Sequence, residues 1–252
     1  MEQWIEALKP RFRWGNIYPR AGGGARRGET YQFYRIVPPE VMEISVRLGI
    51  RDYGKDDIDE AIARFWECVQ DLVDEQVDCI VLGGAPISAQ LGRARVRQLL
   101  DEVQQRHGIP AYAPLEAMIA GLEHLGLRKV AIASRWAGEV NGALAAYLED
   151  AGLEVVGATS RGQWAREAHE MNLEQGMQTA LEVAREAVQM APSAEAILAP
   201  GGAALTLHVI PAIEAESGRV AISNLSAEVW NGLVRTKVIE PVHGWGKLLA
   251  SL

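Results

Sequence analysis

A short apolar run that ends in a pair of glycines occurs twice in this chain, and this repeat most constrains its fold. Residues 79–82 (CIVL) lead into Gly83-Gly84, and residues 196–199 (AILA) lead through Pro200 into Gly201-Gly202. Each run is predicted to be a buried strand that is followed by a helix, a short strand and a further helix. Strands that alternate with helices are typical of parallel sheets with helices on both faces. The repeat therefore predicts two similar lobes from a weak internal duplication.

Apolar periodicity predicts the other elements of an α/β fold. We expect strands at residues 79–82, 111–112, 129–133, 153–156, 196–199 and 220–222, and helices at residues 57–75, 90–106, 115–125, 138–151, 172–190 and 226–235. The predicted architecture is two pseudo-symmetric Rossmann-like lobes with mainly parallel sheets. We assign residues 1–115 to the N-terminal lobe, with residues 226–252 packing back on it, and residues 116–225 to the C-terminal lobe. Because ligands bind at the carboxyl ends of parallel strands, we expect a site in a cleft between the lobes.

Residues 19–30 differ from the rest because they hold Pro19, four glycines and three arginines. This composition predicts a mobile loop. The arginines are Arg20, Arg26 and Arg27. They belong either to a solvated loop or to a lid whose guanidinium groups clamp carboxylates in a bidentate manner. Of the flanking tyrosines, Tyr18 and Tyr34 are candidate acids or hydroxyl donors.

The chain has 252 residues and a formal net charge of −8. This acidic balance argues against nucleic acid and against an anionic membrane as partners, because both require a basic face. A small-molecule carboxylate needs only a few local donors and remains a suitable partner. No apolar run reaches the roughly 20 residues that span a bilayer, and the first residues lack the features of a signal peptide. We therefore expect a cytoplasmic protein and leave its oligomeric state open, a homo-oligomer included.

The two cysteines, Cys68 and Cys79, are too few for a disulfide framework. Cys68 lies at the edge of an apolar helix face and Cys79 inside a predicted strand, so both are interpreted as buried structural thiols. No His and Cys residues have metal-ligand spacing, and we expect no metal site and no cofactor. His208 is either a replacement proton donor or a solvated residue. His243 lies in a tail that either closes over the cleft or forms a surface loop.

Several segments, in order along the chain, resemble one enzyme family. Residues 197–211 (ILAPGGAALTLHVIP) are similar to the second catalytic loop and the following helix of arylmalonate decarboxylases. Residues 220–230 (VAISNLSAEVW), 244–248 (GWGKL) and 130–147 resemble the later strand and helix, the aromatic glycine ending, and the middle strand and helix. Together they cover most of residues 56–248. The chain thus resembles the Asp/Glu racemase superfamily, in the branch of arylmalonate decarboxylases and maleate isomerases.

The resemblance implies chemistry at a carbon next to a carboxylate. In that superfamily two cysteines on opposite faces of the substrate exchange protons; maleate isomerases use one as a nucleophile, and arylmalonate decarboxylases keep only the second. The resemblance places the first cysteine position on Gly84 and the second on Gly201, and neither glycine donates a proton. The position of a loop hydroxyl falls on Ala85 or Pro86, and that of a tyrosine falls on Trp136. The implied chemistry is therefore independent of cysteine.

The glycine loops still carry groups that hold an anion. Backbone N–H groups at glycines and at helix N-termini favour a carboxylate, and a donor that faces a developing oxyanion contributes roughly 10²–10³ in rate. The predicted substrate-binding residues are Gly84, Ala85, Pro86, Arg135, Trp136, Gly201, Gly202, Ala203, Arg20 and Arg26. The predicted catalytic residues are His208, Tyr18 and Tyr34. An apolar pocket is expected from Trp136, Ala203, Ala204 and Leu205.

These features favour a decarboxylase-like lyase that acts on a small carboxylate or malonate-type substrate. Its enolate or enediolate would be held by loop amides. A lyase needs at most one protonation step, on one face, whereas two-thiol racemisation needs carriers on both faces. A maleate-type cis–trans isomerase is the alternative within the enzymes. A non-catalytic carboxylate-binding protein is the alternative outside them.

Overall fold

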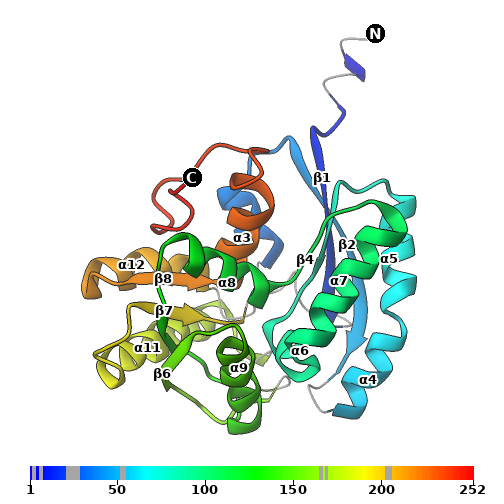
Figure 1. Ribbon diagram of the computed structural model, residues 1–252. Coiled ribbons are helices and arrows are strands. Elements are labelled where there is room, and N and C mark those ends of the chain that lie inside the picture. The colour runs from blue at the N-terminus through cyan, green and yellow to red at the C-terminus, as the bar shows by residue number, and fades with distance from the viewer. Residues whose placement is uncertain are drawn as a thin grey trace.

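The protein forms two four-stranded parallel sheets, each covered by helices (Figure 1). The computed structural model describes residues 1, 4–5, 8–20, 29–51, 55–164, 167, 170–201 and 206–252. The strand order is β2-β1-β3-β4 in the first sheet and β6-β5-β7-β8 in the second. The second order repeats the first strand for strand. This confirms the predicted α/β fold with two pseudo-symmetric lobes and parallel sheets.

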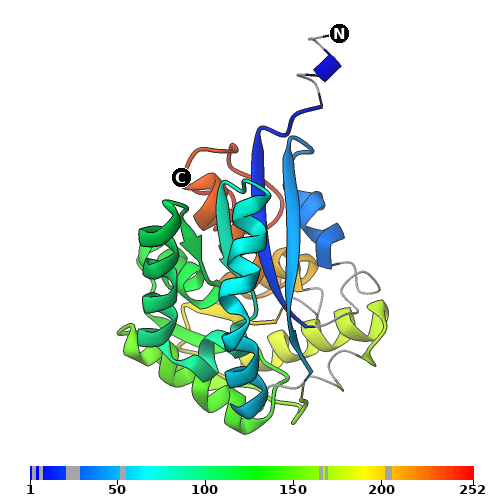
Figure 2. The same ribbon diagram turned by 90° about the vertical axis from the view of Figure 1, so that its right-hand side faces the viewer.

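The first sheet lies between two layers of helices. Its strands are β1 (Phe12–Arg20), β2 (Val41–Ile50), β3 (Cys79–Leu82) and β4 (Ala111–Tyr112). One face is covered by α4 (Lys55–Ala63), α5 (Phe65–Asp74) and α7 (Arg93–His107). Helix α3 (Glu29–Ile36) lies on the opposite side of β1 and β2 (Figure 2). Because β3 is buried on both faces, its sequence is a continuous apolar run.

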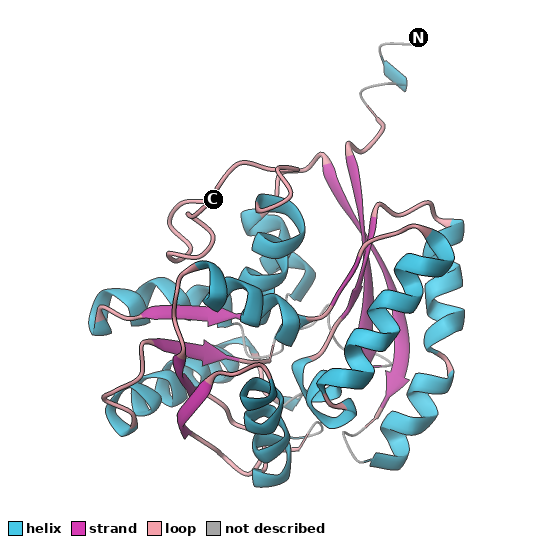
Figure 3. Ribbon diagram, viewed as in Figure 1, coloured by secondary structure: helices cyan, strands magenta, loops and turns pink. Residues whose placement is uncertain are grey.

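The second sheet has the same construction. Its strands are β5 (Lys129–Ile132), β6 (Glu154–Ala158), β7 (Ala196–Ala199) and β8 (Val220–Ser223). Its helices are α8 (Pro114–His124), α9 (Gly138–Asp150), α11 (Leu173–Met190) and α12 (Val209–Ser217), preceded by the 3₁₀ turn η2 (Thr206–His208). Figure 3 shows that β7 and β8 point toward the first lobe. Strand β7 therefore runs toward the first lobe, and Pro200 and Gly201 follow its end.

Two helices that the sequence predicted as continuous are broken. The segment predicted as one helix over residues 57–75 is divided into α4 and α5 at Arg64. The helix predicted from residue 90 begins earlier, as α6 (Ala85–Leu91), and Gly92 separates it from α7. Gly92 has a φ of +75°, a backbone conformation that ends a helix and that glycine adopts without strain. The break lets α6 pack on α9 of the other lobe while α7 follows the first sheet.

The last predicted helix also differs from the expectation. Residues 226–235 were expected to form one α-helix, but α13 (Asn224–Val229) is followed by the π-helix η3 (Trp230–Val234). π-Helical turns are rare in proteins, and many of those that occur lie at functional sites. The hydroxyl and backbone N–H of Ser223 bond reciprocally with those of Ser226, which fixes where α13 begins.

The predicted loop over residues 19–30 is wrong at both ends. Pro19 and Arg20 complete β1, and Glu29 and Thr30 begin α3; residues 21–28 lie outside the described residues. The sequence prediction missed β1, β2 and α3 because β1 mixes aromatic, polar and charged residues (FRWGNIYPR). Its central part is nevertheless buried, and it pairs with both β2 and β3. The N-terminal strand is thus the centre of the first sheet.

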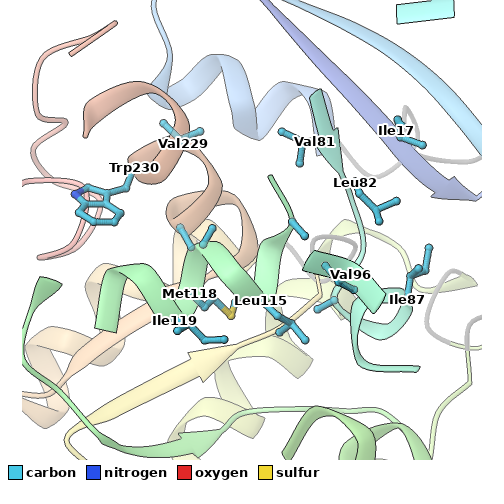
Figure 4. Close-up of a cluster of buried hydrophobic side chains, with 14 of the residues drawn as sticks. Ile17, Val81, Leu82, Ile87, Val96, Leu115, Met118, Ile119, Val229 and Trp230 are labelled. Carbon is cyan, nitrogen blue, oxygen red and sulfur yellow. The ribbon is translucent and has the colours of Figure 1, made fainter. Parts of the chain in front are cut away.

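One hydrophobic core joins the two lobes. Figure 4 shows apolar side chains from β1, β3, α6, α7, α8 and α13, among them Leu82, Leu115 and Val229, gathered between the sheets. Trp14 of β1 is 1% exposed and packs on Phe33 of α3, with ring centroids 5.9 Å apart. On the other side of Trp14, η3 comes so near that a Cβ on Gly232 would lie 2.6 Å from the indole ring. A larger residue at this position would push η3 away from β1.

Replacing Gly232 tests this close approach. We expect Gly232→Ala to lower the free energy of unfolding by about 1–3 kcal/mol, because the added methyl group overpacks the contact with Trp14. The matched control is Gly142→Ala in α9, where the added methyl group meets no atom within 4 Å and removes a helix-weakening glycine. Urea unfolding should show the first variant less stable and the second equal to or more stable than the parent. Equal effects of the two substitutions would contradict the packing argument.

Candidate functional site

The first glycine turn joins β3 to α6. Gly84 has a φ of +97°, which L side chains rarely adopt, and it occupies the N-cap of α6. A Cβ at this position would lie 3.0 Å from Cγ of Pro19 at the end of β1. Both the positive φ and the short distance to Pro19 therefore favour glycine at position 84. The predicted binding residues Ala85 and Pro86 form the first turn of α6 and are buried.

The second glycine turn follows β7. Gly201 is buried, has a φ of +123°, and its N–H donates a hydrogen bond to Oδ1 of Asn224 at 3.3 Å. The indole ring of Trp136 lies 3.6 Å from the place of its missing Cβ. The predicted residues Gly202, Ala203, Ala204 and Leu205 lie outside the described residues. Trp136 is 2% exposed and thus forms an apolar wall beside Gly201.

Arg135 lies beside this second turn. It is 3% exposed, and its guanidinium carbon lies 4.7 Å from the centre of the Trp136 ring. It lines a small cavity, together with Ala133, Thr179, Ala180, Val183, Ala199, Pro200 and Thr206. The cavity lies at the carboxyl ends of β5 and β7, where sites of parallel sheets form. Its role in binding a carboxylate stays a prediction.

A polar cluster that sequence reasoning missed lies on β1 and β2. Oε1 of Glu43 accepts hydrogen bonds from Nδ2 of Asn16 at 3.1 Å and from the hydroxyl of Tyr18 at 2.8 Å. The backbone N–H of Glu43 donates to the hydroxyl of Tyr34 at 2.9 Å. Tyr18 and Tyr34, both predicted as candidates, are thus brought to one glutamate. Asn16 and Glu43 carried no sequence signal, because the strands that hold them were not predicted.

A second carboxyl group, on α13, is buried. Glu228 of α13 is only 8% exposed, and its burial together with the charge of Glu43 raises its pKa to about 8. Asn224 precedes Glu228 by one helical turn, so the two side chains share a face of α13. That face touches Gly201 through Asn224. The charge of Glu43 on the first lobe contributes to the raised pKa of Glu228.

Neither thiol belongs to this site. Cys79 is fully buried within β3, and burial raises the pKa of its thiol well above the usual range. Cys68 is buried in α5 with Sγ 3.6 Å from the backbone oxygen of Arg47, and its pKa is also raised by burial. The interpretation of both as buried thiols is confirmed. A neutral thiol inside the sheet is a poor nucleophile.

The remaining candidates lie outside this polar cluster. His208 is exposed at the end of η2, its ring centroid 5.0 Å from that of Trp245, and burial of part of the ring lowers its pKa. His243 is exposed in the tail. Arg20 ends β1, where its backbone oxygen accepts a bond from Arg47 at 3.4 Å. Arg26 and Arg27 lie outside the described residues.

The fold defines a two-lobed parallel α/β protein with one glycine turn after β3 in the first lobe and another after β7 in the second. A family model described as arylmalonate decarboxylase matches residues 15–249. The chain therefore belongs to the arylmalonate decarboxylase family. A curated arylmalonate decarboxylase from Bordetella bronchiseptica is 27% identical over 195 residues, which cover 77% of this chain and 80% of that protein.

Solved structures show the same fold. A liganded double mutant of arylmalonate decarboxylase, with one glycine changed to cysteine and one cysteine to serine, has a TM-score of 0.82 and 25% identity, covering 94% of this chain and 97% of that one. A cysteine-to-alanine variant of maleate isomerase from Pseudomonas putida S16 with maleate has a TM-score of 0.80 and 18% identity, covering 95% and 97%. At this lower identity the likeness concerns the fold alone.

Membrane-spanning helices and metal clusters are both absent from the part of the chain that the structure describes. No helix among these residues is long and apolar enough to cross a membrane. Within the same ranges, no three His, Cys, Asp or Glu side chains are grouped as ligands for a metal ion.

Burial of Glu228 makes stability depend on pH. The pKa of its carboxyl group is about 8 in the folded chain, against an ordinary value of 4.5. Between these values the folded state holds a proton that the unfolded state has lost, so the free energy of unfolding falls as pH rises. The fall amounts to on the order of 5 kcal/mol and is complete above the folded pKa.

Substituting Glu228 isolates this effect. Glu228→Gln has the shape of the protonated acid, so we expect stability equal to the parent at about pH 5 and greater than the parent at about pH 9. Urea unfolding at several pH values measures both curves. Glu75→Gln, at an exposed position after α5, is the matched control and should follow the parent. Parallel curves for the parent and Glu228→Gln would show that Glu228 titrates normally.

Proposed function

We propose that this protein is a cysteine-independent, decarboxylase-like lyase that acts on a small carboxylate or malonate-type substrate. The matched relatives are decarboxylases and isomerases, which supports an enzyme of one of these kinds. The positions of the two cysteines support the proposal of a reaction that uses no thiol. Both are buried in the first lobe, one inside β3 and one in α5, and both have raised pKa values.

The two glycine turns would hold the substrate. In the proposed reaction, the bond between the α-carbon and the leaving carboxylate breaks, carbon dioxide departs, and the electron pair remains on an enediolate. Backbone N–H groups near Gly84 and Gly201 would stabilise that negative charge. The buried indole ring of Trp136 supplies an apolar surface, and loss of carbon dioxide from an anion is favoured where water is excluded. Proton transfer to the α-carbon completes the reaction.

Tyr18 is the best supported of the three predicted proton carriers. It lies at the end of β1, next to Pro19, which borders Gly84, and its hydroxyl is held by Glu43 at 2.8 Å. Tyr34 is held by the backbone of Glu43 and is 41% exposed. His208 is exposed and contacts Trp245 instead. We therefore assign the proton transfer to Tyr18.

Two alternatives have their own support. A maleate-type cis–trans isomerase agrees with the fold of the maleate isomerases. Without a thiol nucleophile, however, such an isomerase would need another group to add to the double bond. A carboxylate-binding protein without activity agrees with the absence of cysteine at both turns.

A substrate panel distinguishes these functions. We expect the purified protein to release carbon dioxide from at least one malonate whose second substituent is aromatic or alkyl, because such a group stabilises the enediolate or fills an apolar pocket. The panel includes maleate and aspartate, and products are followed by carbon dioxide release and by proton NMR. Formation of fumarate from maleate would favour the isomerase. Saturable binding without any product would favour the binding protein and overturn the lyase.

A second experiment tests the thiol-free chemistry. We expect the double variant Cys68→Ala/Cys79→Ala to keep its turnover rate within about twofold of the parent, because neither thiol reaches the site. It should lose some stability, roughly 1–3 kcal/mol, from the cavities left in the core. Activity of the double variant should also resist a thiol reagent. If the folded double variant turned over about 100-fold more slowly, as expected for removal of a catalytic group, the proposal would be contradicted.

A further inference from the structure

The side-chain amide of Asn16 is oriented by the residue beside it. Asn16 lies in β1, is 8% exposed, and donates from Nδ2 to Oε1 of Glu43 at 3.1 Å. The same Oε1 atom accepts a hydrogen bond from the hydroxyl of Tyr18 at 2.8 Å. Because an ionised carboxylate only accepts hydrogen bonds, the nitrogen of the Asn16 amide faces Glu43 and the oxygen faces away from it.

The oxygen end of this amide faces the first glycine turn. Strand β1 pairs with β3, and Asn16 lies opposite Val81, one residue before the end of β3. Oδ1 of Asn16 lies 3.2 Å from the place that a Cβ on Gly83 would take. Gly83 has no side chain on this side, and the next residue, Gly84, is the N-cap of α6. The amide oxygen is therefore directed at the turn to which we assign substrate binding.

Oδ1 of Asn16 is an acceptor that lacks a donor. It is buried and has no hydrogen-bond partner among the described residues. The neighbouring backbone oxygen of Ile17 is instead occupied, because it accepts the N–H of Gly83 at 3.0 Å. A buried acceptor without a donor is costly, so native proteins rarely leave one open. The group that completes Oδ1 has to donate a hydrogen bond, whereas a carboxylate oxygen at this place would be repelled.

We propose that Asn16 selects a malonate-type acid whose α-carbon carries a hydroxyl or an amino group, with Oδ1 accepting a hydrogen bond from that group. This inference rests on the proposed function, and it deepens that function by naming the substrate class. The backbone N–H groups of the turn hold a carboxylate, and Asn16 holds the donor next to it. Asn16 thus determines specificity, and the proton transfer stays with Tyr18.

The spacing of the groups at the turn agrees with such a substrate. Oδ1 of Asn16 faces Gly83, and the N–H groups assigned to the carboxylate lie near Gly84, the adjacent residue. In a 2-hydroxy or 2-amino acid the donor and the carboxylate are bonded to the same carbon, so they are adjacent as well. An ordered water molecule is the competing occupant, because water also completes buried acceptors.

Three malonates that differ in one small group distinguish these occupants. Methylmalonate, hydroxymalonate and aminomalonate are similar in size, but only the last two carry a donor. Their intrinsic reactivities differ, so the ratio of kcat/KM between a donor-bearing compound and methylmalonate is compared between the parent and its variants. Whichever donor gives the higher ratio in the parent identifies a hydroxyl or an amino group as the preferred substituent.

Replacing Asn16 removes the acceptor. In Asn16→Leu we expect this ratio to fall about 10- to 100-fold, because leucine is similar in size and leaves no buried oxygen that needs a donor. The matched control is Asn231→Leu in η3. Asn231 is also buried, at 5% exposed, and its Oδ1 also has no partner in the part of the chain that the structure describes. This control should keep the ratio of the parent.

A second variant leaves Asn16 in place and changes only its orientation. In Glu43→Gln the new amide both donates and accepts, so it no longer fixes which end of Asn16 faces the turn. We expect the ratio to fall in this variant too, and it serves if Asn16→Leu fails to fold. A merely structural role for Asn16 would slow all three compounds alike and leave the ratio unchanged. An unchanged ratio in folded Asn16→Leu, or in Glu43→Gln where the first variant does not fold, overturns the proposal.

Calorimetric binding of the same three compounds separates this inference from the proposed function. A parent that releases no carbon dioxide, yet binds a donor-bearing compound about 10-fold more tightly than methylmalonate, overturns the lyase and keeps the role of Asn16 if Asn16→Leu loses the preference. An active parent whose preference is the same in Asn16→Leu overturns the inference alone. A parent with neither turnover nor preference overturns both.

Discussion

The packing of the α13–η3 segment against β1 determines how the two lobes and the site fit together. This segment leaves the second sheet at β8 and crosses to the first, where Gly232 lets η3 lie on Trp14. Apolar residues of both lobes share one large core, and a second, smaller core lies within the C-terminal lobe around β5, β7, α11 and α12. On α13, Asn224 accepts a hydrogen bond from the Gly201 N–H, and Glu228, one turn further on, is buried.

The burial of Glu228 lowers the free energy of unfolding as the pH rises. A carboxyl group at the position of Glu228 is held neutral by burial, and raising the pH forces the protein to bury a charge or to open. A glutamine would fill the same space at no such cost. Burial together with a like charge is the way a carboxyl group reaches a pKa near neutral pH. For Glu228 the same burial lowers stability as the pH rises.

The sequence was sufficient to predict the two-lobed fold and part of the candidate site. The strands at β3 and β7 and the glycines after them follow from apolar runs and from glycine's freedom at positive φ, which are local properties. The first sheet's central strand was missed because its polar residues, Asn16 and Tyr18, are held by Glu43 of the neighbouring strand, so β1 lacks a simple apolar pattern. Glu43 and Glu228 were missed for a different reason. They lie far apart in the chain, and only the folded crossing of α13 brings them together.

The location of the polar cluster bears on the kind of reaction. Racemisation requires proton carriers on two faces of one carbon, whereas Tyr18, Glu43 and Asn16 all project from β1 and β2 on the first lobe. In the second lobe, Gly201 faces the apolar ring of Trp136, and its N–H donates a hydrogen bond to Asn224. An indole ring neither accepts nor supplies a proton near neutral pH. In the proposed lyase, hydroxyl and carboxyl groups on the first lobe and an aromatic ring on the second would suit the addition of a single proton from one side.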